Sequence, residues 1–396
     1  MKQNIKITYL CHACLLLEID GIRIITDPWL VGPCWADNIW QYPPAQILPE
    51  EISDIDYIYI SHGHEDHLHS ETLKRINPNV KSKAKIIVPD FGKPYFKKAL
   101  IANGLTNIIF IQNESSIYLS KDIKATIFNC DAGDDDSSLL IETKEGNIFM
   151  QTDNLMTNNL AKKIGSKYDI DIAFVMTSRT GIFPGFYELE IDKLRILAEE
   201  KSKKSYEIVT SIIKGLKPKY VLPYASDLCY LGELYYMNFF HRKSKHNFVK
   251  YVKDNNLNFE TVILGPNDEI NLLNKKLTKT KQSYHDFDGN DLPLFGYQKR
   301  HEVYKYQKEE KKYNEKEITK DIEFFTKKIN IASEKWSQKE YKVLWQIDTI
   351  ENGIIHLDHQ LPNHIQYINN IKDDEYDLKL YIQGYRLQRL VRGDYK

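Results

Sequence analysis

One nine-residue segment, Ser61–His69, constrains this chain more than any other. It reads Ser-His-Gly-His-Glu-Asp-His-Leu-His and so carries four histidines and two carboxylates. It follows a short apolar run, Tyr57–Ile60, which predicts a buried strand that ends in a loop. Side chains on such a loop can converge on one point, and imidazoles with carboxylates suit zinc, iron, manganese or nickel. Because the chain has only 12 histidines in 396 residues, four in one loop indicate a metal site rather than a solvated loop.

The composition is that of an ordinary globular protein, with 42% hydrophobic and 28% charged residues. The length suits one large domain and a smaller one. The formal net charge is −1, so no overall field attracts nucleic acid, and we expect no nucleic-acid partner. No segment approaches the roughly 20 apolar residues that span a bilayer. The N-terminal apolar run lacks the cleavage site of a signal peptide, so we expect no membrane association.

The five cysteines form an odd, sparse set. Such a set argues against a disulfide framework and favours a reducing, cytoplasmic location. Cys11-His12-Ala13-Cys14 has the spacing of a redox motif. The motif lies within an apolar stretch that predicts a strand, however, so we expect buried thiols rather than a redox pair.

Acidic residues stand at the ends of several predicted strands. Residues 5–30 predict two or three strands, with a tight turn at Asp20-Gly21. The strand at 23–26 ends at Asp27, because Pro28 interrupts the ladder. Asp27 can orient a neighbouring metal-ligand loop, or it can simply cap a turn. Asp153 follows another predicted strand, at 147–151.

The first 265 residues otherwise alternate between strands and helices. We expect strands at 85–88, 107–111, 124–129, 137–143, 147–151, 172–176, 219–222 and 260–264, and helices at 70–76, 94–103, 190–216 and 231–255. From about residue 275 the chain becomes lysine-rich, and interleaved acids indicate a solvated segment there. We therefore expect a domain at 1–274 and an accessory α+β region at 275–396, with a helix at 316–336 and strands at 341–360 and 376–385.

Two irregular loops are candidates for substrate contacts. The loop at 31–50 contains Trp35 and Trp40, and it can wall a substrate pocket or pack as a surface flap. Arg179 lies in a loop that follows the predicted strand at 172–176. Its guanidinium can hold a phosphate or carboxylate in a bidentate manner, or form a surface ion pair.

The pattern His62-x-His64-x-Asp66-His67 resembles the H-x-H-x-D-H signature of the metallo-β-lactamase superfamily. The resemblance covers about residues 5–265 and implies an α/β fold, an αββα sandwich with a metal site, often dinuclear, at one sheet edge. It also implies that His62 and His64 hold the first metal and that Asp66 and His67 hold the second. Asp153 would then bridge the two metals.

The chain departs from that superfamily pattern at two positions. Many members have a third histidine where this chain has Asp131-Ala132-Gly133-Asp134, and a final histidine where it has Tyr224-Ala225-Ser226-Asp227. Either one metal is lost or carboxylates replace the imidazoles, with Asp131 or Asp134 and Asp227 as candidates. An oxygen-richer ligand set favours iron or manganese over zinc.

Four short elements are similar to the CMP-N-acetylneuraminate hydroxylase family: Thr26–Leu30, Gly181–Pro184, Lys217–Tyr220 with Leu222–Ala225, and Leu378–Arg389. That family pairs the metal fold with a Rieske iron–sulfur domain, which needs two cysteine and two histidine ligands. We find no separate segment that supplies them. If the protein is an oxygenase, we therefore expect its electrons to come from another polypeptide, an external electron-transfer protein.

Three functions remain open at this point. The first is a non-haem iron oxygenase, with one iron or a dinuclear centre, that hydroxylates a nucleotide sugar or similar anionic metabolite, with Arg179 and the tryptophan loop as substrate contacts. The second is a metal-dependent hydrolase of a lactone, phosphodiester or amide, in which zinc or manganese supplies hydroxide and Asp66 positions the water. The third is a non-catalytic interaction module on a degenerate site.

Overall fold

The computed structural model describes residues 5–35, 37–177, 183–226, 228–239, 245–281, 292–300, 315–333, 341–349, 353–361, 364–372 and 375–392. The chain forms two compact units that divide after Arg300. We expected the division at 274. It falls later because β17 (Lys276–Lys281) pairs with β16 (Asp268–Leu273) and so completes a sheet of the first unit.

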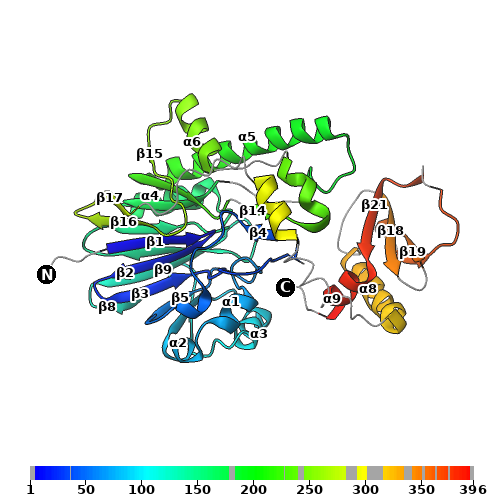
Figure 1. Ribbon diagram of the computed structural model, residues 1–396, viewed down its shortest axis with the longest axis horizontal. Helices are drawn as coiled ribbons and strands as arrows, with labels where there is room; N and C mark the ends of the chain where they lie inside the picture. Colours follow the sequence, from blue (N-terminus) through cyan, green and yellow to red (C-terminus); the bar gives the residue numbers. More distant parts are fainter. Residues whose placement is uncertain are drawn as a thin grey trace. The chain divides into compact units, whose positions relative to one another are not determined.

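Two sheets form the centre of the first unit (Figure 1). The eight-stranded sheet has the order β17-β16-β1-β2-β3-β5-β6-β7, and the seven-stranded sheet has the order β15-β13-β12-β11-β10-β9-β8. The remaining strands of the first sheet are β1 (Ile5–Cys11), β2 (Cys14–Ile19), β3 (Ile22–Thr26), β5 (Tyr57–Tyr59), β6 (Lys85–Pro89) and β7 (Ile108–Ile111). Those of the second are β8 (Ser116–Ser120), β9 (Ile123–Asn129), β10 (Ser137–Glu142), β11 (Asn147–Met150), β12 (Ile172–Met176), β13 (Tyr220–Tyr224) and β15 (Glu260–Thr261).

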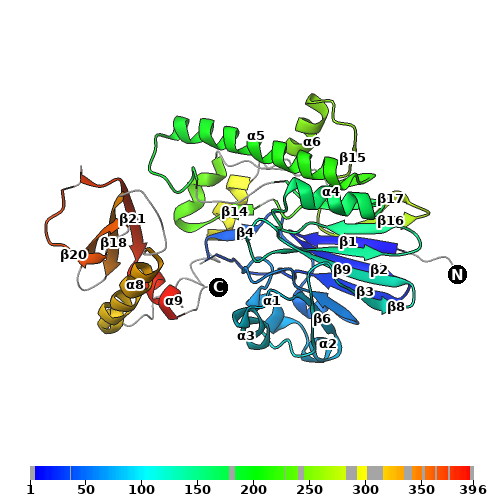
Figure 2. The same cartoon turned by 180° about the vertical axis from the view of Figure 1, so that it is seen from behind.

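Apolar side chains fill three layers around these sheets. Along β2, for example, Leu15 and Leu17 point between the two sheets, whereas Cys14 points to the outer layer, as strand alternation requires. The outer face of the first sheet packs against α1 (Ser70–Arg75), α2 (Pro78–Lys83) and α3 (Pro94–Ala102). The outer face of the second packs against α4 (Asn158–Lys167), α5 (Ile191–Leu216) and α6 (Lys245–Asp254), as Figure 2 also shows. The expected αββα sandwich is confirmed.

One edge of the sandwich collects the ends of strands from both sheets. β1 is antiparallel to β2, β2 is antiparallel to β3, and β3 is parallel to β5, so β1, β3 and β5 all end at the same edge. In the second sheet β10 and β11 are antiparallel, so the start of β10 lies beside the end of β11. The segments that follow or precede these ends therefore meet at one place.

Several local elements differ from the expectations. Helices α2 and α4 and strand β8 were not predicted. The segment expected to be one helix at 231–255 forms a 3₁₀ helix, η2 (Gly232–Phe239), and then α6, while 240–244 fall outside the described residues. A small ribbon also forms from β4 (Ile39–Gln41) and β14 (Leu228–Tyr230), and η1 (Pro49–Glu51) precedes β5.

The second unit is a small α+β structure, as expected. Its sheet has the order β20-β19-β18-β21 and packs against α8 and α9 around Ile347, Leu357 and Leu387. Its elements are η3 (Glu315–Glu317), α8 (Ile318–Ser333), β18 (Tyr341–Thr349), β19 (Gly353–Leu361), β20 (Ile365–Tyr367), β21 (Leu378–Gln383) and α9 (Gly384–Arg392). Among the residues that the structure describes, no helix has both the length and the apolarity to cross a membrane.

Candidate metal centre

The histidine-rich loop follows β5 and is closed by the start of α1. The amides of His67 and Leu68 both donate to the carbonyl oxygen of His64, at 3.1 and 2.8 Å, which makes a tight turn. His69 caps α1, because its Nδ1 accepts a hydrogen bond from the Thr72 amide at 3.2 Å. His69 is thus the N-terminal cap residue of α1, and its role is to fix the end of the loop.

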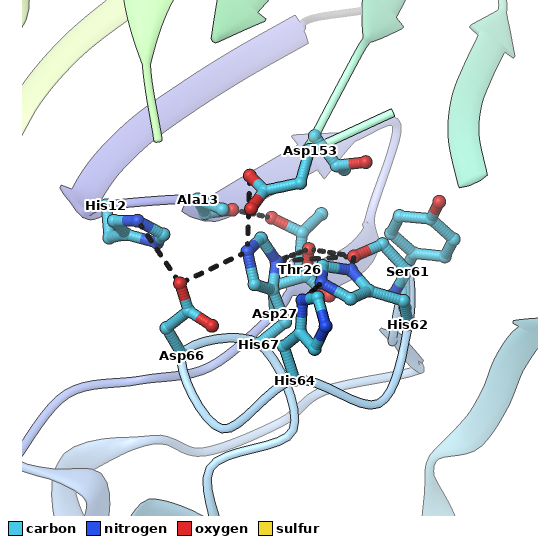
Figure 3. A network of polar contacts seen from close by, with 12 residues as sticks. His12, Ala13, Thr26, Asp27, Ser61, His62, His64, Asp66, His67 and Asp153 are labelled. Atoms are coloured by element: carbon cyan, nitrogen blue, oxygen red, sulfur yellow. Dashed lines mark hydrogen bonds and ion pairs between the residues drawn. The ribbon is translucent and has the colours of Figure 1, made fainter. Parts of the chain in front are cut away.

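Asp27 orients this loop from the end of β3. Its carboxylate is fully buried. Oδ1 accepts from the Ser61 amide at 2.8 Å, while Oδ2 accepts from Ser61 Oγ at 2.7 Å and lies 2.8 Å from His67 Nδ1 (Figure 3). When Nδ1 of His67 donates to this carboxylate, Nε2 is the nitrogen left to bind a metal ion. The orienting contact expected for Asp27 is confirmed.

A first group of metal-ligating side chains consists of His62, His64 and Asp153, whose ligand atoms lie within 4.8 Å of one another. His62 Nε2 is 2.8 Å from His64 Nδ1. Asp136, directly before β10, adds a further carboxylate, with Oδ1 3.3 Å from His62 Nε2. The group therefore combines both sheets: the imidazoles come from the first and the carboxylates from the second.

A second group consists of His12, Asp66 and His67, also with ligand atoms within 4.8 Å of one another. Oδ2 of Asp66 lies 3.8 Å from His12 Nε2 and 3.8 Å from His67 Nε2. Oδ1 of Asp153 lies 3.4 Å from His67 Nε2. Asp153 thus contacts both groups, which is the placement that a bridging ligand requires.

The residues present fit metal ions. Three ligand atoms are buried and have no hydrogen-bond partner among the described residues, namely Asp66 Oδ1, His67 Nε2 and Asp153 Oδ1. Leaving such atoms unsatisfied costs free energy, and buried polar atoms in proteins nearly always have a partner. Imidazole nitrogens and carboxylate oxygens that face one another in this way are satisfied together by a cation.

The electrostatics of the site also favour a cation. Burial raises the pKa of Asp66 to about 6 and that of Asp136 to about 7. Burial lowers the pKa of His12 to about 3, so this imidazole is neutral near pH 7. For His67, burial would lower the pKa, but Asp153 and the other nearby carboxylates raise it. His67 in turn lowers the pKa of Asp153 despite its burial.

The structure brings together five of the predicted site residues: His62, His64, Asp66, His67 and Asp153. Asp131 lies elsewhere. It is exposed, and its carboxylate accepts hydrogen bonds from the amide and the hydroxyl of Thr157, the cap of α4. Asp134 is also exposed. Arg179 and Asp227, the predicted anion-binding residue and late ligand, lie outside the described residues.

Two site residues were not predicted, His12 and Asp136. His12 lies at the tip of the β1–β2 hairpin. In the sequence it stands between two cysteines whose spacing is typical of a redox motif rather than of a metal site. Cys11 and Cys14 face each other across the hairpin and are fully buried, which raises the pKa of both thiols. All five cysteines are free thiols, and the expectation of buried thiols at Cys11 and Cys14 is confirmed.

The two tryptophans of the 31–50 loop have different environments. Trp35 is 38% exposed, its ring centroid is 5.0 Å from that of His64, and its amide donates to Glu65 Oε2 at 2.5 Å. Trp40 is buried on β4, which pairs with β14. Trp35 is therefore available at the mouth of the site, whereas Trp40 packs in the fold.

Comparison with known proteins agrees with this architecture. Residues 6–128 match the family described as "Beta-lactamase superfamily domain". The cytidine monophosphate-N-acetylneuraminic acid hydroxylase of Mus musculus is 28% identical over 284 residues, which are 69% of this chain and 44% of that protein. This chain thus spans less than half the length of that relative.

Two solved structures are also similar. CmlA, a diiron β-hydroxylase from Streptomyces venezuelae, is 16% identical, with a TM-score of 0.46 over 70% of this chain and 54% of that chain. Igni18, a metallo hydrolase from Ignicoccus hospitalis, is 15% identical, with a TM-score of 0.43 over 70% of this chain and 100% of that chain. From the family match and the curated relative, the chain carries a metallo-β-lactamase superfamily domain and is a distant homologue of the cytidine monophosphate-N-acetylneuraminic acid hydroxylases.

Proposed function

We propose that this chain is a non-haem iron hydroxylase that acts on a nucleotide sugar or a similar anionic metabolite. The observation that carries the proposal is the composition of the two groups, each with two imidazoles and one carboxylate at one edge of the sandwich. Two histidines and one carboxylate are the ligand set of non-haem iron(II) oxygenases. The 28% identity to a hydroxylase of a nucleotide sugar, over 69% of the chain, supports the substrate class.

The reaction requires an electron donor besides dioxygen. In a hydroxylation one oxygen atom enters a C–H bond and the other leaves as water, so each turnover uses two electrons and two protons. Iron held by the two groups supplies the redox chemistry. The electrons come, in this proposal, from a separate electron-transfer protein.

The chain's own residues hold the geometry for that chemistry. Asp27 fixes the ring of His67 through its Nδ1, and Ser61 Oγ lies 2.9 Å from His62 Nδ1, so one imidazole in each group is oriented by a buried partner. The exposed indole of Trp35, next to His64, offers a flat apolar surface to a planar group of the substrate.

A second candidate is a metal-dependent hydrolase. Two histidines and a carboxylate also hold catalytic zinc, which lowers the pKa of its water to roughly 7. One observation favours this function: Asp66 Oδ1 is buried and has no hydrogen-bond partner among the described residues, so it is free to accept a hydrogen bond from a water molecule and position it. The presence of both complete groups argues against a degenerate, non-catalytic module.

The discriminating experiment begins with anaerobic purification and a count of iron, zinc and manganese per chain. Dioxygen is then added with a chemical reductant and a CMP-sugar, and oxygen consumption and product mass are measured. The proposal predicts iron in the protein and a product 16 mass units heavier than the substrate, since one oxygen atom is added. Stoichiometric zinc without oxygen consumption would refute it and favour the hydrolase.

Two variants test the site itself. Asp153→Ala removes the carboxylate that contacts both groups, and we expect the metal content to fall. Asp131→Ala is the matched control, because Asp131 binds Thr157 rather than the site. It should leave the metal content unchanged.

A further inference from the structure

We propose that His12 is a protein ligand of the second metal ion, in the role that the superfamily pattern gives to a histidine after the late strand. This inference rests on the proposed function, because it requires that the chain binds metal. Residues 224–227, where that histidine is expected, contain none. Among the residues that the structure describes, the second group therefore has Asp66, His67 and the bridging Asp153 unless another side chain enters it.

The first line of support is the position of the His12 ring nitrogen. Nε2 lies 3.8 Å from Asp66 Oδ2, and His67 Nε2 lies at the same distance from that oxygen. This separation is too long for a hydrogen bond. Two ligands that each lie about 2.1 Å from one tetrahedral metal ion are about 3.4 Å apart. The three side chains thus face one another at a spacing that suits shared coordination.

The second line of support is that the tip of the β1–β2 hairpin lies where β13 ends. The carbonyl oxygen of His12 accepts a hydrogen bond from the amide of Ala225 at 3.0 Å. Ala225 lies within the segment where the pattern has its final histidine. His12 therefore reaches the site from the first sheet at the point where the missing ligand would have come from the second.

The third line of support is that the His12 side chain is held in place. Its backbone has a φ of +41°, a left-handed conformation that is costly for a residue with a Cβ and that clusters at functional sites. The ring lies between Trp29 and His67, with centroids 5.3 Å from each, and it is 5% exposed. A ligand positioned in advance loses little conformational freedom when the metal binds.

The test is a Co²⁺ titration of chelator-treated protein, followed by visible absorption and by elemental analysis after removal of free metal. The wild-type chain should bind two ions in two steps. His12→Ala should keep the step that belongs to His62 and His64 and weaken the other by at least about 100-fold, so that one ion remains after dialysis. Cys14→Ala, which alters the same buried hairpin outside both groups, is the matched control and should bind two ions as the wild type does.

A second measurement avoids any variant and any loss of folding. In the Co²⁺-loaded wild-type chain labelled with ¹⁵N-histidine, each ligating imidazole gives a strongly shifted N–H signal. Ligation by His12 predicts signals from four histidines, namely His12, His62, His64 and His67. Three such signals, or two tightly bound ions in folded His12→Ala, would overturn the inference. A wild-type chain that binds no metal would instead refute the proposed function.

Discussion

The substitution Asp27→Asn tests how the fold prepares the metal centre. Asp27 is fully buried, and its Oδ2 faces both Ser61 Oγ, at 2.7 Å, and His67 Nδ1, at 2.8 Å. An asparagine keeps the shape but loses the charge. If its NH₂ group faces His67, that nitrogen must accept rather than donate, and the proton moves to Nε2, the nitrogen that faces Asp66 and Asp153.

The expected effect is on metal affinity rather than on the number of sites. Loss of a partner that orients a ligating histidine typically weakens metal binding 10- to 100-fold, or about 1.4–2.7 kcal/mol. Zn²⁺ affinity is measured by competition with a chromophoric chelator, and circular dichroism checks the fold. Asp20→Asn is the control, because Asp20 also has a positive φ but is exposed in a turn. If Asp27→Asn bound Zn²⁺ as tightly as Asp20→Asn, Asp27 would not orient His67.

Three further predictions concern protonation, the mouth of the site and the second unit. Because burial raises the pKa of Asp66 to about 6 and of Asp136 to about 7, both carboxyls hold protons below these values and must release them to bind metal. Calorimetry in two buffers should therefore show Zn²⁺ affinity falling as the pH drops below about 7, with proton release rising; an affinity that is flat from pH 8 to 5 would contradict this. Trp35→Ala should raise the KM for a CMP-sugar by an amount equivalent to about 1–3 kcal/mol of stacking and leave the metal content unchanged; an unchanged KM would exclude Trp35 from the substrate contacts. Leu357→Ala removes a fully buried side chain from the core of the second unit and should lower its free energy of unfolding by about 2–5 kcal/mol in urea melts; a loss below about 1 kcal/mol would mean that this core is not tightly packed.

Local signals in the sequence were enough to predict the histidine-rich loop that follows β5. The apolar run before Ser61 and the spacing of His62, His64 and His67 are contiguous, so strand, loop and ligands could be predicted together. Asp27 and Asp153 could be predicted because each lies within three residues of the end of a strand. The sandwich was predicted from the resemblance, and the clear periodicity of α5 was sufficient for that helix. Short polar elements such as α4 gave no comparable signal.

The two site residues that were not predicted, His12 and Asp136, depend on long-range topology. His12 reaches the site only because β1 and β5 end at the same edge, which follows from the pairing of β1, β2, β3 and β5. Asp136 is one of four aspartates in residues 131–136, and the sequence does not show which of them reaches the site. The end of the β9–β10 hairpin determines which of these aspartates reaches the site. There the Cys130 amide donates a hydrogen bond to the carbonyl oxygen of Asp136 at 2.8 Å, so Asp136 lies directly before β10. No local pattern contains that information.

The central claim is that two groups at one edge of the sandwich each hold a metal ion. It is tested most directly by a crystal structure of the metal-loaded chain with anomalous diffraction recorded at the iron and zinc absorption edges. We predict two anomalous peaks, each about 2.0–2.2 Å from its ligand atoms. One should contact His62, His64 and Asp153, and the other should contact His12, Asp66 and His67. Metal-loaded crystals that lack the anomalous peak at one or both groups would contradict the claim.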